Sequence, residues 1–205
     1  MNLMTIAGCV SACALTTIAT ADIPHMGGPM KHISVTLNSD NNLEAHVDTS
    51  GDMPMLTNYP GEHYDGSAAV LDGTYYNRQY GWTVSGFWAP PPGSFLWIDQ
   101  VAVTSGLNAY SGGNMVNLGS YDPIFGTAGS DSAIMWDGVM LHNWYSTDLP
   151  GDYEATYRVY LGNIDGQATA GFGDVFVTLN WGTVPTPGVL AAMSLGGLVA
   201  TRRRR

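Results

Sequence analysis

The body of the chain, residues 22–183, consists of short runs of alternating apolar and polar residues separated by turn-forming pairs. A period of two is that of a half-buried β-strand, and no comparable helical periodicity occurs. The sequence contains 26 Gly and 11 Pro, and its turn signals include Asp72-Gly73, Asp137-Gly138, Pro150-Gly151 and Asp165-Gly166. Strands are therefore expected at 32–37, 43–47, 68–71, 74–76, 80–88, 95–104, 132–136, 139–145, 153–161 and 174–181.

This pattern predicts an all-β fold, a single antiparallel β-sandwich that is jelly-roll-like or Ig-like, over residues 22–183. One hairpin is expected over 134–141, because an Asp-Gly pair suits a two-residue type I′ turn. A second hairpin is expected from the last two strands, with its crossing near Asp165-Gly166. In the last strand Val175, Val177 and Leu179 should line one apolar face and Phe176 and Thr178 the other, and Tyr157, Val159 and Leu161 alternate in the same way in the preceding strand.

The first 21 residues contain no charged side chain and end in the small-residue sequence Ala19-Thr20-Ala21. This is typical of a secretory signal peptide, with cleavage between Ala21 and Asp22. Two alternatives remain: a buried N-terminal helix, and a lipoprotein leader in which Cys9 or Cys13 carries the lipid. Cleavage after Ala21 would remove both cysteines, so the mature protein would have no disulfide even though export permits one.

The C-terminal segment, residues 184–205, begins with Val184, Pro185, Thr186, Pro187 and Gly188. An apolar, glycine-containing stretch at 189–200 follows, and after Thr201 the chain ends in Arg202, Arg203, Arg204 and Arg205. A hydrophobic helix followed by cations is held at the membrane with its cations on the cytoplasmic side. Residues 185–201 would span about 25 Å as a helix, less than the roughly 30 Å hydrocarbon core, so a transient membrane association is expected.

This segment, together with the signal peptide, resembles the PEP-CTERM sorting tail of Gram-negative surface proteins. The resemblance covers residues 185–205, and Thr186 stands where the family most often has Glu. It implies that an exosortase-type membrane protease recognises the tail, removes it, and delivers the protein to the cell surface or the extracellular matrix. An ordinary single-pass membrane anchor is the alternative. The tail specifies sorting and carries no information about what the body does.

Apart from the terminal arginines, the basic residues are Lys31, Arg78 and Arg158, against 17 acidic residues. The body thus carries a net charge of −14, and such a surface repels phosphate backbones, which excludes nucleic-acid binding. The densest polar cluster is Glu62-His63-Tyr64-Asp65, which is interpreted as a hydrogen-bonding loop in preference to a cation site. Several aspartates are expected in loops without a calcium-binding frame, which leaves calcium open; these are Asp48, Asp52, Asp122, Asp131, Asp148, Asp152, Asp165 and Asp174.

No nucleophile elbow, zincin motif or phosphate-binding loop is present, so no catalytic residue and no metal ligand is assigned. The six tryptophans are expected mostly in the core, although aromatic rings also stack on sugars. We therefore expect an exported, non-catalytic structural or adhesive protein of the cell surface or matrix, without a cofactor, that associates with surface polysaccharide. A carbohydrate-binding module is the alternative, followed by a glycan-active hydrolase with two opposed carboxylates.

Overall fold

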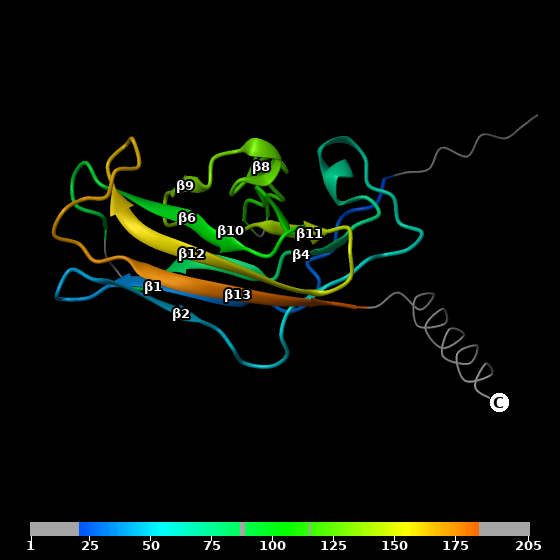
Figure 1. Cartoon of the computed structure of the whole chain (residues 1–205), viewed down its shortest axis with the longest axis horizontal. Coiled ribbons are helices and arrows are strands. Elements are labelled where there is room, and N and C mark those ends of the chain that lie inside the picture. Colours follow the sequence, from blue (N-terminus) through cyan, green and yellow to red (C-terminus); the bar gives the residue numbers. More distant parts are fainter. Residues whose placement is uncertain (1–20, 87–88, 115, 185–205) are drawn as a thin grey trace, which may run out of the picture.

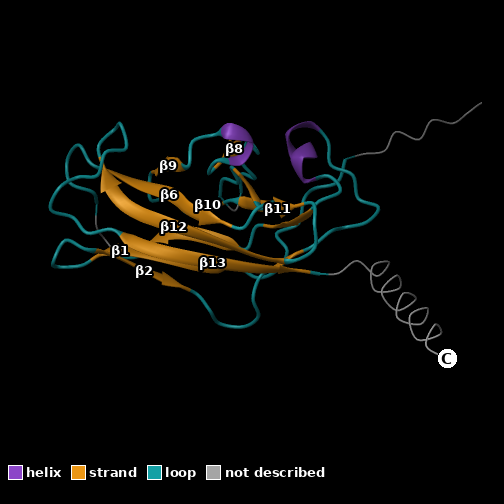
Figure 2. Ribbon diagram, viewed as in Figure 1, coloured by secondary structure: helices purple, strands orange, loops and turns teal. Residues whose placement is uncertain are grey.

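The structure is a computed structural model that describes residues 21–86, 89–114 and 116–184. It consists mostly of β-strands, which form three sheets, together with two short 3-10 helices, η1 (Gly66–Leu71) and η2 (Thr127–Gly129). Both helices lie on the same side of the sheets (Figure 2). The expected C-terminal apolar helix lies outside the described residues. Within the described ranges, no helix has the length and apolar character needed to cross a membrane.

The three sheets are named here after their central strands. The β1 sheet has the order β10-β5-β1-β2, with β1 (Lys31–Leu37), β2 (Leu43–Val47), β5 (Tyr80–Val84) and β10 (Leu141–His142). The β11 sheet has the order β4-β11-β7-β8, with β4 (Tyr75–Asn77), β7 (Asn108–Tyr110), β8 (Pro123–Ile124) and β11 (Trp144–Thr147). The β12 sheet has the order β3-β13-β12-β6-β9, with β3 (Met55–Leu56), β6 (Phe95–Val103), β9 (Ala133–Trp136), β12 (Asp152–Gly162) and β13 (Val175–Thr183) (Figure 1).

The expected final hairpin is confirmed. Strands β12 and β13 pair antiparallel from Asp152 opposite Gly182 to Val159 opposite Val175. Val177 and Leu179 are buried, whereas Phe176 is 59% exposed, as the alternation predicted. The pairing is local in sequence, so the turn residues and the apolar period were sufficient to specify it.

The prediction of a purely antiparallel arrangement is wrong. Strand β1 pairs with β5 in parallel, from Lys31 opposite Tyr80 to Val35 opposite Val84, and β13 pairs with β3 in parallel. A parallel pair needs a long connection. For β1 and β5 this connection is the chain from residue 38 to residue 79, which leaves the β1 sheet after β2 and contributes β3 and β4 to the other two sheets.

The expected hairpin over 134–141 is also wrong. Strand β9 pairs with β6 in the β12 sheet, whereas β10 pairs with β5 in the β1 sheet, so the chain crosses between sheets at this point. The Asp137 carboxylate accepts a hydrogen bond from Val139 N at 2.9 Å, and Trp136 Nε1 donates to Val139 O at 2.7 Å. These local bonds form a turn that carries the chain across the core, with Trp136 buried at the crossing.

Two further expected strands differ from the structure. Residues 68–71 belong to η1, in which only Leu71 is buried. The strand prediction failed here because a short apolar run does not distinguish a helix from a strand. The expected strand at 139–145 divides into β10 and β11, which belong to different sheets. Asn143, which is fully buried, lies at the break.

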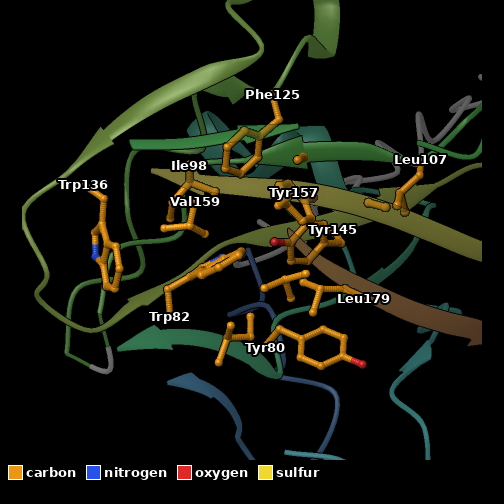
Figure 3. Packing of buried hydrophobic residues seen from close by; sticks show 14 of the residues in the cluster. Tyr80, Trp82, Ile98, Leu107, Phe125, Trp136, Tyr145, Tyr157, Val159 and Leu179 are labelled. Atoms are coloured by element: carbon orange, nitrogen blue, oxygen red, sulfur yellow. The ribbon is translucent and has the colours of Figure 1, made fainter. Parts of the chain in front are cut away.

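A single aromatic-rich cluster connects the three sheets. Trp82 of β5 contacts Tyr157 of β12 edge-on at 5.6 Å, and Tyr145 of β11 contacts Trp181 of β13 at 4.5 Å between ring centroids. Figure 3 shows Trp82, Tyr145 and Tyr157 converging in the core together with the aliphatic residues Ile98 of β6 and Val159 of β12. Burial of large apolar side chains supplies most of the driving force for such a fold.

The exposure of the tryptophans separates one of them from the rest. Four of the five in the described ranges, Trp82, Trp136, Trp144 and Trp181, are buried, as expected for core residues. Trp97 is partly exposed and lies on the opposite side of β6 from the buried Leu96 and Ile98. The outer face of the β12 sheet is therefore the candidate functional surface.

Candidate functional site

Strand pairing aligns a row of apolar and aromatic side chains across the outer face of the β12 sheet. Trp97 of β6 lies opposite Tyr160 of β12 on one side and opposite Met135 of β9 on the other. Directly opposed residues have their Cβ atoms about 5 Å apart, so the three side chains are neighbours. Met135 is 50% exposed, whereas Tyr160 is 7% exposed, so Trp97 is the ring of this row that a ligand can reach. We refer to Met135, Trp97 and Tyr160 as the aromatic row.

The Trp97 ring is held in a defined position. Its Nε1 donates a hydrogen bond to Asn163 O at 3.0 Å, and its plane lies within 16° of the Tyr160 ring at a centroid distance of 6.5 Å. Tyr160 OH in turn donates to Gly166 O at 2.8 Å, so the loop after β12 supports both rings. A ring that is already ordered loses little conformational entropy when a ligand binds to it.

A second row of side chains follows the aromatic row on the same face. Asp99 of β6 lies opposite Arg158 of β12, which lies opposite Phe176 of β13. The Arg158 guanidinium bonds Asp174 at 2.5 Å and lies 4.5 Å above the Tyr160 ring. The face thus combines aromatic rings with carboxylate acceptors and one guanidinium donor.

A groove continues the aromatic row beyond β9. It has a volume of about 570 Å³, within the usual range for small-ligand sites, and it is lined mainly by apolar side chains. Phe95, Met135 and Val139 form part of this lining, and Val139 is 57% exposed. Asn114 and Asp137 are the polar residues at its margin. Exposed apolar side chains grouped beside a groove are typical of an interaction surface.

The burial of cations makes the surface more acidic than composition alone indicates. Lys31 is 5% exposed and Arg78 is 2% exposed. Among the described lysines and arginines, only Arg158 therefore presents a charge at the surface, and it is paired with Asp174. Ligands with high negative charge are repelled by such a surface, whereas neutral ligands are accepted.

The polar loop predicted at 62–65 is a hydrogen-bonding cluster, as expected, and the structure adds residues that lie far away in the sequence. Tyr64 OH donates to Glu62 at 2.5 Å and bonds Tyr76 OH at 2.6 Å. His25 Nε2 bonds the same Glu62 carboxylate at 2.9 Å. His63 pairs with Asp72 instead, and the Asp65 side chain makes no capping bond to η1. The cluster fastens the N-terminal segment to β4.

The residues predicted for processing lie mostly outside the described ranges. Asp22, the expected first residue after cleavage, donates from its backbone N to His63 O at 2.9 Å and accepts from His63 N at 3.0 Å. Val184 N donates to Leu56 O at 3.1 Å. Ala21 is described as well, whereas Ala19, Pro185, Thr186, Pro187, Gly188 and the four arginines 202–205 are not.

Of the candidate calcium aspartates, Asp48 and Asp52 line the same hollows, but the described residues bring no third ligand to them. Within the described part of the chain, no three His, Cys, Asp or Glu side chains converge at a distance that suits a metal ion. Asp174 is instead engaged with Arg158, and Asp48 accepts a hydrogen bond from Ser50 N at 2.8 Å.

Acidification is expected to destabilise the fold in two stages. Burial lowers the pKa of His142, so between neutral pH and pH 5 the imidazole is protonated in the unfolded chain but remains neutral in the folded chain. This difference lowers the free energy of unfolding as the pH falls. Hydrogen bonds from Tyr64 and His25 lower the pKa of Glu62, and those from Ser50 lower the pKa of Asp48, so further stability is lost below the ordinary pKa values of these groups, 4.5 and 3.8. Thermal unfolding followed by circular dichroism between pH 8 and pH 3 should show a midpoint that falls throughout; a midpoint that rises between pH 7 and pH 5 would contradict this.

No protein-family model, curated protein or solved structure matches this chain. The sequence pattern does not distinguish Trp97 from the other five tryptophans, and it does not predict the groove lined by Phe95 and Met135. The available signal was the alternation along 95–99, where Phe95, Trp97 and Asp99 share one side of the strand.

Proposed function

We propose that this chain is an exported, non-catalytic adhesive protein, built on a β-sandwich, that binds neutral polysaccharide of the cell surface or matrix. The observation that carries the proposal is the aromatic row, in which Trp97 is partly exposed and already held by Asn163 and Tyr160. Aromatic faces stack on the C–H faces of sugar rings, and this contact needs no charge.

The surroundings of the row support the same ligand class. Asp99 and Asp174 can accept hydrogen bonds from sugar hydroxyls, and Arg158 can donate them. The groove lined by Met135 adjoins the row and adds apolar contact surface beside it. The acidic surface disfavours strongly anionic glycans.

Binding is expected to be weak for a single domain. Each stacked ring contributes on the order of 1 kcal/mol, so the dissociation constant should be high micromolar or weaker. Calcium, which screens or bridges carboxylates, should strengthen association with an immobilised glycan, and EDTA should reverse that gain.

Replacing Trp97 with alanine is expected to weaken binding about three- to tenfold, because one stacking contact is lost. The full-length chain, purified in a detergent without a sugar headgroup, would be tested by pull-down on insoluble cellulose, chitin and mannan, with and without EDTA. Leu149→Ala is the matched control, since Leu149 is 68% exposed and lies outside the row. Absence of binding to every glycan would favour a purely structural protein, and release of soluble sugar at a measurable turnover would favour an enzyme.

We further propose that residues 1–21 direct export and that the tail at 184–205 directs sorting by an exosortase-type protease with transient membrane association. Replacing Arg202 to Arg205 with serine should remove the charges that retain the apolar segment, so that cells release or mis-sort the protein. Replacing Pro185 and Pro187 with alanine should block processing of the tail. Fractionation and immunoblotting measure both effects, and unchanged surface delivery of both variants would overturn the sorting proposal.

A further inference from the structure

Lys31, the first residue of β1, is a buried cation at the edge of two hollows. Its Nζ donates to the backbone carbonyl of Ser50, and within the described residues it forms no ion pair with a carboxylate. An ammonium group has three N–H donors, and a buried donor without an acceptor is costly. The side chain therefore has hydrogen-bonding capacity that the surrounding protein does not use.

The two hollows have volumes of about 280 and 360 Å³. Both are lined by Lys31, Asp48, Gly51, Asp52 and Met53. The first also reaches Gly28 and Gln79, and the second reaches Tyr80 and Asn180. We refer to the two together as the Lys31 pocket.

The charges around the Lys31 pocket select the kind of ligand. A cationic ligand would be repelled by the buried ammonium of Lys31. An anionic ligand would be repelled by Asp48 and Asp52 and by the high negative charge of the surface. Hydrogen bonds from Ser50 lower the pKa of the Asp48 carboxyl, so this group is an acceptor at neutral pH. A neutral molecule with several hydroxyl groups satisfies both, because each hydroxyl accepts from Lys31 or donates to a carboxylate.

We infer that the Lys31 pocket binds the end of a neutral glycan, one or two sugar rings long. This inference rests on the proposed function and assigns it a second contact. Asn180, which lines the pocket, lies on the same exposed side of β13 as Phe176 and Thr178. The pocket thus adjoins the outer face of the β12 sheet, at the end of β13 that is distant from the aromatic row.

The test is chemical-shift mapping of the ¹⁵N-labelled full-length chain in detergent with maltose, cellobiose and diacetylchitobiose. At least one disaccharide should shift the backbone amides of Lys31, Gly51 and Asp52. Asp52→Asn should weaken this binding about tenfold, the effect of losing one hydrogen bond to a charged group. Asp52 is exposed and its carboxylate makes no hydrogen bond within the described residues, so the variant should fold. Asp40→Asn, which changes an exposed turn residue outside both sites, should have no effect.

Lys31→Met should abolish the shifts, and Lys31→Arg should retain part of the affinity. Shifts that occur only around Trp97, Tyr160 and Phe176 would overturn the Lys31 pocket while leaving the proposed function intact. Absence of shifts at both places, with no pull-down on any glycan, would overturn both. Shifts at Lys31 caused by glycine but by none of the sugars would assign the pocket to a zwitterion and overturn this inference.

Discussion

Replacing Arg78 with methionine is expected to lower the free energy of unfolding by about 3–5 kcal/mol, because several buried carbonyl acceptors lose their donor and each costs about 1–3 kcal/mol when left unpaired. The guanidinium donates to the carbonyls of Gly112, Asn114 (at 2.5 Å) and His142 (at 3.3 Å), and it lies 5.0 Å above the Trp144 ring. Methionine fills part of the volume but leaves these buried carbonyls without a donor. Urea denaturation followed by circular dichroism measures the change.

Two companion variants make this prediction specific. Arg78→Lys should recover only part of the stability, because an ammonium lacks the planar fork that reaches several carbonyls at once. Arg158→Met is the matched control: it removes a cation that is 33% exposed, for which a loss of about 1 kcal/mol or less is expected. An Arg78→Met variant within about 1 kcal/mol of the parent would show that the fold around Gly112 and Asn114 does not depend on this side chain.

Gly112→Ala is expected to destabilise the fold by about 4 kcal/mol or more, or to prevent folding. A Cβ at this position would lie 1.7 Å from His142 O and 2.9 Å from Asn143 Cα, both of which are backbone atoms that cannot move aside. The adjacent hydrogen bond from His142 N to Gly113 O, at 2.8 Å, holds the two backbone segments at this separation.

The yield of soluble protein and its urea midpoint test the Gly112 prediction. Gly151→Ala is the control, since a Cβ there meets only Tyr153 side-chain atoms, at 3.6 Å or more. This variant should unfold within about 0.5 kcal/mol of the parent, as surface substitutions usually do. A Gly112→Ala variant as stable as the Gly151→Ala control would contradict the close approach of the loop to β10.

Local features of the sequence were sufficient where a strand pairs with its neighbour along the chain. The range 43–47 agrees with β2 at both ends, and the β12–β13 hairpin has the predicted faces. The segments on both sides of the Asp137-Gly138 turn showed an equally regular apolar pattern, yet β9 and β10 belong to different sheets. The difference lies in Trp136, whose burial in the common core is favoured over local pairing.

The candidate site depended more strongly on the tertiary structure. Six tryptophans occur in similar alternating runs, and alternation places Trp97 on one side of its strand without telling whether that side faces the core, as it does for Trp82 and Trp181. What separates them is the side of the sheet that faces the core, which is known only once the sheets are packed. The Lys31 pocket also depends on tertiary packing, because β1, the loop at 48–53 and β13 meet there from distant parts of the chain.

By itself the sequence determined the β-class, most strand positions and the excess of acidic residues, because backbone period, turn preference and charge are properties of neighbouring residues. The tertiary structure decided the parallel pairing of β1 with β5, the burial of Lys31 and Arg78, and the exposure of Trp97. These depend on contacts between segments distant in sequence, which the free energy of the whole core selects and which no local pattern encodes.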